Sequence, residues 1–240
     1  RRDHHARRRM EQPVSLTVHS ISGSPMGWRV LLGLAFKRLD YRVIYLQGAE
    51  KEHRQPAFLQ MNPHGKVPVL THEGVHHRES LAILGWLDTT FPDPPLFGET
   101  PREMQTIWTA ATGWSDYFLK ATNAAVFPVF RGADGAPRTE PGDTSPEEAA
   151  RLLKVELDAL EQQLQAQPFV CAETPTAADA VAYPEIGRLM RARQTRPRSM
   201  ERLGLGDFDH LYPNIARWRD EIAALPGYDR TVPPHWAASD

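Results

Sequence analysis

Residues 62–70 of this chain read NPHGKVPVL, and this stretch decides the fold. Asn62 and Pro63 end a short helical pattern, and a β-prone run begins at Val67. Pro68 stands at the beginning of that run, where its missing N–H does least harm to a sheet. The strand edge stays open there, so an extended peptide can pair with the backbone of Val67. The bond before Pro68 is of the kind that can be cis. An ordinary edge-strand proline explains the same residues equally well.

The elements on either side of this stretch alternate between strand and helix periodicity. The predicted elements are, in order, a strand at 14–18, a helix from 25, a strand at 41–46, a short helix at 57–60, a hairpin of 67–71 and 74–77 turning near Glu73-Gly74, and a helix from 80. This order, β-α-β-α-β-β-α, predicts a small α/β domain over residues 13–91.

The rest of the chain is predicted to be helical. Residues 92–102 are rich in proline and read as a linker between domains. Apolar residues then recur at helical spacing over 103–230, which predicts an all-helical domain, and 231–240 form a tail. The basic segment 1–12 has no apolar core, so it is not a secretory signal and is interpreted as a disordered or artificially added extension.

Composition places the chain among globular proteins and excludes several classes of partner. Of its 240 residues, 41% are hydrophobic and 24% are charged, as in ordinary globular proteins. The net charge of -2 gives no reason to expect a nucleic-acid partner. No apolar run approaches the roughly 20 residues that span a bilayer, so no membrane partner is expected. The single cysteine, Cys171, suits a reducing compartment and a cytoplasmic location.

Residues 24–30, SPMGWRV, predict the beginning of a helix that could bind an anion. Serine is a preferred N-cap and proline a preferred first helical residue, so Ser24 and Pro25 mark the helix start. The unpaired N–H groups and the dipole of such a helix favour a negative charge just beyond its end. A serine hydroxyl there can donate to the same anion. Taken alone, the segment is more simply explained by a plain capping serine.

A second segment of this kind follows the hairpin. We expect Ser80 to cap another helix, which would place a second anion-binding helix terminus in the same domain. The carboxylate of Glu79 could accept a hydrogen bond from an ammonium group. Together the two residues could hold both charged ends of an amino acid, although capping alone also accounts for them.

Taken together, these segments resemble the cytosolic-type glutathione S-transferase superfamily from Val14 to about Tyr228. NPHGKVPVL followed by ESLAIL at 79–84 resembles its glutathione-site signature. SPMGWRV resembles the helix start of the serine-type, tau- and zeta-like classes, in a bacterial-style member. PTAADAVAYP at 175–184 resembles the motif of the helical domain in which Thr176 and Asp179 form a capping box. The segment 212–228 resembles the last long helix.

The resemblance implies a thioredoxin-like domain packed on a helical domain, glutathione as co-substrate, no metal, and a homodimer. It implies that Ser24 is the catalytic residue that donates a hydrogen bond to the glutathione sulfur. It also implies that the backbone of Val67, before a cis Pro68, pairs with the cysteinyl part. Glu79 and Ser80 would hold the γ-glutamyl end.

Two further residues match positions near the glycyl carboxylate of glutathione. Lys66 matches a lysine of tau-like members, whereas His53 stands where those members often have a second lysine. The chain departs from the zeta pattern at Pro25 and Met26, where a serine and a cysteine would follow the catalytic serine. This departure speaks against a zeta-type isomerase, and the lack of a cysteine in the first domain speaks against a thiol transferase.

The expected activity is detoxifying conjugation of the glutathione thiolate to a small, mostly apolar electrophile. Its pocket is expected between the first helix and the helical domain, lined by Met26, Trp108, Thr112 and Ser115. Ordinary packing between the domains is the alternative, and it is favoured for Trp108. A glutathione-dependent lyase, dehalogenase or isomerase on the same fold remains open, as does a non-catalytic glutathione-binding or scaffold protein.

Overall fold

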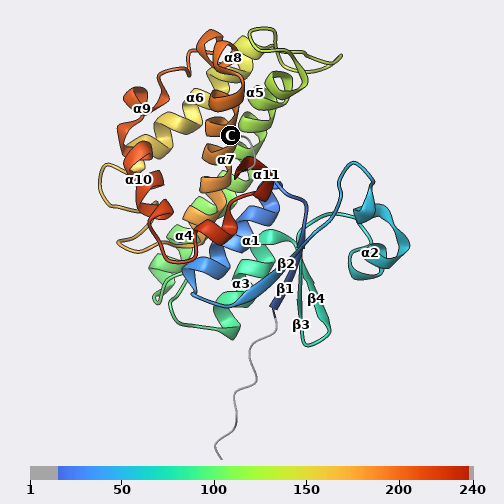
Figure 1. The fold of residues 1–240 in the computed structure, drawn as a ribbon. Coiled ribbons are helices and arrows are strands. Elements are labelled where there is room, and N and C mark those ends of the chain that lie inside the picture. The colour runs from blue at the N-terminus through green and yellow to red at the C-terminus, as the bar shows by residue number, and fades with distance from the viewer. Residues whose placement is uncertain (1–15, 238–240) are drawn as a thin grey trace, which may run out of the picture.

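The computed structural model describes residues 16–237, and the extension predicted at 1–12 lies outside them. The first domain consists of β1 (Leu16–Ser20), α1 (Pro25–Phe36), β2 (Tyr41–Tyr45), a 3₁₀ turn (Glu52–Arg54), α2 (Pro56–Met61), β3 (Val69–His72), β4 (Val75–Arg78) and α3 (Ser80–Thr90). The predicted order β-α-β-α-β-β-α is therefore confirmed. Figure 1 shows this domain in blue to blue-green beside the helical domain in green to red.

The first domain is built on a four-stranded mixed sheet in the order β2-β1-β3-β4. β1 pairs in parallel with β2 and antiparallel with β3, so that Val18 lies opposite both Val43 and Leu70. The β3–β4 hairpin turns at Glu73 and Gly74, with φ of 48° and 79°. The turn therefore falls where the sequence predicts it.

The second domain is helical throughout its described part. Its elements are α4 (Pro101–Gly113), a π-helical turn (Trp114–Phe118), α5 (Leu119–Arg131), α6 (Pro146–Gln163), α7 (Ala177–Thr195), α8 (Pro197–Arg202), α9 (Phe208–Leu211), α10 (Pro213–Ala223), a 3₁₀ turn (Asp229–Thr231) and α11 (Pro234–Ala237). The thioredoxin-like plus all-helical architecture is thus confirmed. None of the helices in the described residues is long and apolar enough to cross a bilayer.

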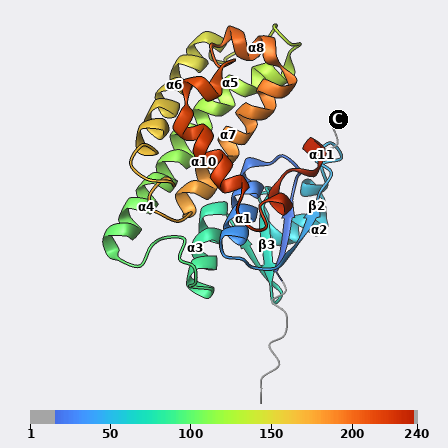
Figure 2. The same ribbon diagram turned by 60° about the vertical axis from the view of Figure 1, so that its left-hand side comes forward.

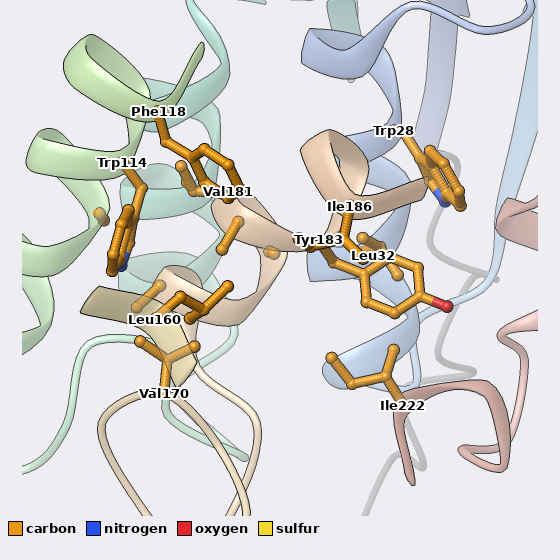
Figure 3. Packing of buried hydrophobic residues seen from close by; sticks show 14 of the residues in the cluster. Trp28, Leu32, Trp114, Phe118, Leu160, Val170, Val181, Tyr183, Ile186 and Ile222 are labelled. Atoms are coloured by element: carbon orange, nitrogen blue, oxygen red, sulfur yellow. The ribbon is translucent and has the colours of Figure 1, made fainter. Parts of the chain in front are cut away.

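Helix α7 forms the centre of the molecule and joins the two domains (Figure 2). Figure 3 shows Tyr183 and Ile186 facing the α1 residues Trp28 and Leu32. A side chain at Gly187 would collide with the Trp28 ring, so glycine allows the two helices to approach closely. Because α1 packs directly on α7, the start of α1 is held in a fixed place relative to the helical domain.

The capping box predicted at Thr176 and Asp179 is present at the start of α7. One carboxylate oxygen of Asp179 accepts from the Thr176 backbone N–H at 2.8 Å, and the other accepts from the Trp218 indole at 2.8 Å. Asp179 is fully buried, so these hydrogen bonds satisfy a charge that would otherwise be costly. Asp179 therefore has a structural role, away from the candidate site.

Candidate functional site

Ser24 caps α1, as predicted. Its backbone is extended, with φ of -66° and ψ of 120°, and its Oγ accepts a hydrogen bond from the Gly27 N–H at 3.3 Å. Pro25 is the first helical residue. A serine hydroxyl can accept and donate at the same time, so capping leaves the O–H available to a ligand. Capping and ligand binding are thus compatible at this residue.

The loop that carries NPHGKVPVL is held from within by Asn62. This buried side chain donates from Nδ2 to the Lys66 carbonyl at 2.7 Å and accepts at Oδ1 from the His64 N–H at 3.1 Å. Gly65 has φ of +57°, and a side chain there would lie 2.8 Å from the His53 carbonyl oxygen. These contacts explain why asparagine and glycine occupy these positions, because they set the path of the chain into Val67.

The bond between Val67 and Pro68 is cis. Both residues precede β3, which begins at Val69. Pro68 is buried and Val67 is half-buried. The proline therefore directly precedes the strand, which begins two residues later than the predicted start at Val67.

The prediction that Ser80 caps a helix is wrong by one residue. The N-cap of α3 is Glu79, and Ser80 is the first helical residue. Glu79 has φ of 63°, a conformation that costs energy for a residue with a side chain, and it makes no capping bond through its side chain. The hydroxyl of Ser80 instead donates to the Met26 sulfur at 3.7 Å. The N-terminus of α3 still lies beside α1.

A cavity of about 350 Å³ gathers most of the residues that the family resemblance implies for glutathione, and we call it the glutathione cleft after that expectation. Its lining comprises Pro25, Met26, Asn62, Lys66, Val67, Pro68, Glu79, Ser80, Leu119, Asn123 and Phe127. The first domain contributes the start of α1, the start of α3 and the loop before β3. Lys66 and Glu79 are exposed at its edge. The structure thus brings together both a cation and a carboxylate with two helix starts.

His53 and Ser24 are not among the residues that line the glutathione cleft. His53 lies in the 3₁₀ turn before α2, half-buried, with its carbonyl behind Gly65. Ser24 directly precedes Pro25, which does line the cleft. Ser24 is therefore at the border of the cleft, whereas His53 supports the loop from behind.

Three predicted lining residues lie outside this cavity. Trp108 stacks on Phe97 with ring centroids 4.2 Å apart, so it packs between the domains. Thr112 is exposed and donates to the Trp108 carbonyl at 2.7 Å. Ser115 accepts a hydrogen bond from the Arg29 guanidinium at 2.7 Å.

The helical domain instead contributes one face of α5 to the glutathione cleft. Leu119, Asn123 and Phe127 are spaced four residues apart, so they lie along one side of the helix. The sequence analysis did not identify these residues, although their four-residue spacing is visible in the sequence. What the sequence does not show is which face of the helix meets the first domain.

A buried ion network fixes α1 against the helical domain behind the cleft. The Arg29 guanidinium lies 3.5 Å from one carboxylate oxygen of Glu185, and Arg188 lies 2.9 Å from the other. Arg29 and Glu185 are fully buried. Since removing one member of such a network leaves an uncompensated charge, the network specifies one arrangement of the two domains.

The described residues offer neither a reactive thiolate nor a metal centre of their own. Burial, with the nearby Asp179 carboxylate, raises the pKa of Cys171 to about 12. Within residues 16–237, no group of three or more His, Cys, Asp or Glu side chains could hold a metal ion. In this part of the chain, a thiolate nucleophile would have to come from a bound thiol.

Comparisons with known proteins identify relatives of both domains. Residues 18–95 match the family model described as "Glutathione S-transferase, N-terminal domain", and residues 147–221 match "Glutathione S-transferase, C-terminal domain". Over 230 residues the chain is 30% identical to a maleylacetoacetate isomerase of Pseudomonas aeruginosa, covering 91% of this chain and 96% of that protein.

Two further relatives agree with these matches. The chain is 38% identical to glutathione S-transferase 1 of Dianthus caryophyllus over 90 residues, which span 38% of this chain and 39% of that protein. The crystal structure of a glutathione S-transferase from the Antarctic clam Laternula elliptica matches with a TM-score of 0.73 at 28% identity. That match covers 94% of this chain and 95% of the other.

Proposed function

The chain belongs to the glutathione S-transferase family, and from this premise we propose that it conjugates glutathione to small, mostly apolar electrophiles. In this proposal Ser24 stabilises the glutathione thiolate. The observation that carries it is the glutathione cleft, where Lys66, Val67, Glu79 and Ser80 meet beside the start of α1. This set supplies a partner for each charged end of a tripeptide with a sulfur at its centre.

Each part of glutathione has a chemically matched partner in the cleft. The carboxylate of Glu79 accepts from the γ-glutamyl ammonium group, and the N-terminus of α3 at Ser80 attracts the neighbouring carboxylate. The backbone of Val67 pairs with the cysteinyl residue in the manner of an added strand. Lys66 attracts the glycyl carboxylate. The sulfur then lies towards Ser24.

The energy needed to ionise the thiol is within reach of these groups. A free thiol has a pKa of about 8.5, and lowering it by two units requires about 2.7 kcal/mol of preference for the thiolate. A hydrogen bond to a charged group contributes about 1.5–3 kcal/mol. The dipole of α1 adds up to about 1 kcal/mol. Ser24 and the start of α1 are therefore sufficient together.

The thiolate is the nucleophile, and serine forms no covalent bond in this mechanism. The sulfur attacks an electrophilic carbon, a carbon–sulfur bond forms, and the leaving group departs with its electron pair. The thiol proton is lost to solvent when glutathione ionises in the cleft. Met26 and the α5 residues Leu119 and Phe127 supply apolar surface beside the sulfur.

The test is an ultraviolet difference titration of bound glutathione. The thiol pKa is expected about two units below that of free glutathione in the wild type. In Ser24→Ala the thiol pKa should rise most of the way to that of free glutathione. In Ser24→Thr, which retains a hydroxyl, the thiol pKa should stay lowered. Ser145 caps the distant helix α6 in the same manner, so Ser145→Ala is the matched control. An unchanged pKa in Ser24→Ala would refute the role of Ser24.

A glutathione-dependent isomerase is the second candidate. It is favoured by the similarity to the Pseudomonas aeruginosa maleylacetoacetate isomerase along nearly the whole chain. Pro25 and Met26 speak against it, as they replace the serine and cysteine of the zeta pattern. Turnover of chloronitrobenzene, isothiocyanate, aryl-ether, haloalkane and maleyl substrates distinguishes transferase, lyase, dehalogenase and isomerase. A non-catalytic binder would be retained on immobilised glutathione and turn over none of them.

We also propose that the protein is a cytoplasmic homodimer, as the family resemblance implies. Light scattering coupled to gel filtration measures its mass in solution, and the expected result is twice the 27.1 kDa of one chain. A mass of one chain at micromolar concentration would contradict the dimer. Glutathione is the only co-substrate required by the proposed reaction.

A further inference from the structure

A second cavity, of about 430 Å³, lies on the other side of Ser24. We call it the arginine pocket, and it is lined by Ser22, Gly23, Phe127, Phe130, Arg188, Arg191, Thr195, Arg196, His235 and Trp236. Phe127 lines both this pocket and the glutathione cleft. Gly23 lines one cavity and Pro25 the other, so Ser24 stands in the chain between them. A molecule in the arginine pocket would thus approach a sulfur at Ser24 from the side opposite the tripeptide.

The charge of the arginine pocket is one-sided. Three arginines line it, and none of its described lining residues is acidic. Arg188 does pair with Glu185, but the same carboxylate also serves Arg29. Two guanidinium groups therefore share one carboxylate, which leaves a net positive charge on Arg29, Arg188 and Glu185 taken together.

Arg196 has hydrogen-bonding capacity that the protein does not use. One terminal nitrogen, Nη1, donates to the Thr195 carbonyl at 2.9 Å. Its Nε is buried and has no hydrogen-bond partner. A ligand in the arginine pocket would not reach this buried Nε, so it would bind the part of the Arg196 guanidinium that lines the pocket.

His235 connects α11 to the loop before Ser24. Burial, with the nearby Arg191 guanidinium, lowers the pKa of His235. Its ring lies 2.6 Å from the Ser22 hydroxyl, measured from Nδ1 to Oγ. The tail of the chain thereby meets the loop before Ser24 and forms one wall of the pocket.

The remaining walls are aromatic. The guanidinium of Arg188 lies 5.2 Å from the centre of the Phe127 ring, and that of Arg191 lies 6.0 Å from the Trp236 ring. These are cation–π distances, which fix the rings and the guanidinium groups relative to each other. The pocket therefore combines flat apolar surface with fixed cations, which suits a planar organic anion.

We infer that the electrophilic co-substrate of this enzyme carries a carboxylate on a planar, apolar body, and that Arg196 and Arg188 bind this carboxylate. The inference rests on the proposed transferase function and names its substrate class. The planar body lies against Phe127, and the reactive carbon faces the sulfur beside Ser24. Guanidinium groups favour carboxylates because their N–H donors match the two oxygens.

A larger cavity shows why the arginine pocket is the better anion site. This cavity, of about 550 Å³, also contains arginines, among them Arg193 and Arg219. Both pair with Asp209, at 2.9 and 3.1 Å, and Asp209 itself lines the cavity. An anion in this cavity would therefore meet the Asp209 carboxylate, whereas Glu185 is fully buried and does not line the arginine pocket.

The kinetic test compares a carboxylate substrate with its neutral ester. In 4-chloro-3,5-dinitrobenzoate and its methyl ester the thiolate attacks the same carbon, a carbon–sulfur bond forms, and chloride leaves with the bonding pair. The methyl ester withdraws electrons more strongly than the carboxylate, so each kcat/KM is divided by the uncatalysed rate constant of that compound with glutathione. This ratio is expected to be about tenfold higher for the acid than for the ester in the wild type, as one charge-assisted hydrogen bond supplies. Equal ratios for acid and ester in the wild type overturn the inference without any variant.

Variants then locate the carboxylate. Arg196→Gln is expected to abolish the preference for the acid over the ester. Arg196→Lys, which keeps the charge, is expected to retain part of the preference. Arg198→Gln removes an exposed arginine of α8 that does not line the pocket, and it is expected to leave the preference intact. A preference that survives in Arg196→Gln, or that disappears in Arg198→Gln, contradicts the assignment.

A binding measurement separates failure of this inference from failure of the proposed function. Isothermal titration calorimetry with 3,5-dinitrobenzoate, which has no leaving group, measures the pocket without any reaction. Tighter binding of the acid than of its methyl ester, lost in Arg196→Gln, supports the anion site even if no electrophile is turned over. Turnover of the neutral substrate with equal binding of acid and ester leaves the transferase standing and overturns the carboxylate.

Discussion

The two cavities that share Phe127 and reach the residues on either side of Ser24 in the chain are built in different ways. The glutathione cleft is formed largely by two helix starts and one loop of the first domain. One cation, Lys66, and one carboxylate, Glu79, lie at its edge. The arginine pocket is formed by α5, α7, α11 and the loop before Ser24, and the charged side chains among its lining residues within 16–237 are arginines. A cleft that presents both a positive and a negative charge suits a zwitterionic peptide. A pocket lined by arginines favours electrophiles that carry a negative charge. The division suggests that binding of the nucleophile and choice of its target can be changed separately.

The largest expected effect comes from the network beneath both cavities. Glu185→Gln leaves the buried guanidinium groups of Arg29 and Arg188 without their counter-charge, which costs about 3–5 kcal/mol of unfolding free energy. Denaturant unfolding followed by circular dichroism measures the loss. Glu147→Gln removes an exposed partner of Arg202 and is expected to leave the midpoint unchanged. Equal stability of Glu185→Gln and wild type would show that the network does not hold the domains together.

Next in size is the loss of the thiolate at the border between the cavities. A thiol with a pKa two units below 8.5 is about 75% ionised at pH 7, against about 3% for the unshifted thiol. Ser24→Ala is therefore expected to lower kcat/KM about 20-fold at pH 7. The difference from wild type should nearly vanish above pH 9, where glutathione ionises unaided. A deficit that stays constant across a pH–rate profile would point to misplacement of the substrate instead.

A smaller effect should be confined to the glutathione cleft. Glu79→Gln removes the acceptor for the γ-glutamyl ammonium group and is expected to raise the KM for glutathione about tenfold. The kcat and the KM for the electrophile should change little. Glu73→Gln is the matched control, because Glu73 is also exposed, has positive φ and lies outside the cleft. A shift in the electrophile KM instead would break the separation of the two cavities.

The smallest expected effect is a pH dependence on the side of the arginine pocket. Burial and the nearby Arg191 guanidinium lower the pKa of His235, so the folded chain takes up a proton less readily than the unfolded chain. The titration of His235 therefore leaves the free energy of unfolding unchanged above the unfolded pKa of about 6.5. It lowers the free energy of unfolding as the pH falls below that value.

Unfolding of wild type and His235→Gln at pH 7.5 and pH 5.5 measures this term. The acid-induced loss of stability is expected to be smaller in His235→Gln than in wild type. His210→Gln, at an exposed position on α9, should behave as wild type. The same acid-induced loss in all three proteins would exclude a contribution from His235.

The elements around the glutathione cleft could be predicted in detail because residue type decides their local backbone conformation. The cap at Ser24 and the loop around Pro68 follow from residue types that allow few alternatives. The N-cap of α3 lies one residue before the predicted Ser80, because Glu79 adopts positive φ at the end of the hairpin. No propensity rule signals that a glutamate will take this conformation.

The face of α5 that meets the first domain could not be predicted in the same way. A π-helical turn at Trp114–Phe118 separates α4 from α5. One extra residue in a helical turn rotates everything after it by about 100°. The predicted lining residues Thr112 and Ser115 lie at the end of α4 and within this turn, so neither follows the rotation. The residues after it, Asn123 and Phe127, line the cleft.

A crystal structure of the complex with glutathione tests the central claim most directly. The account predicts the peptide along Val67 and Glu79, with its sulfur within hydrogen-bond reach, about 3–3.5 Å, of the Ser24 hydroxyl. The sulfur should also face the arginine pocket across Phe127. A sulfur that lies away from Ser24, with the hydroxyl bonded only within its own helix, would contradict the account and leave Ser24 as a helix cap alone.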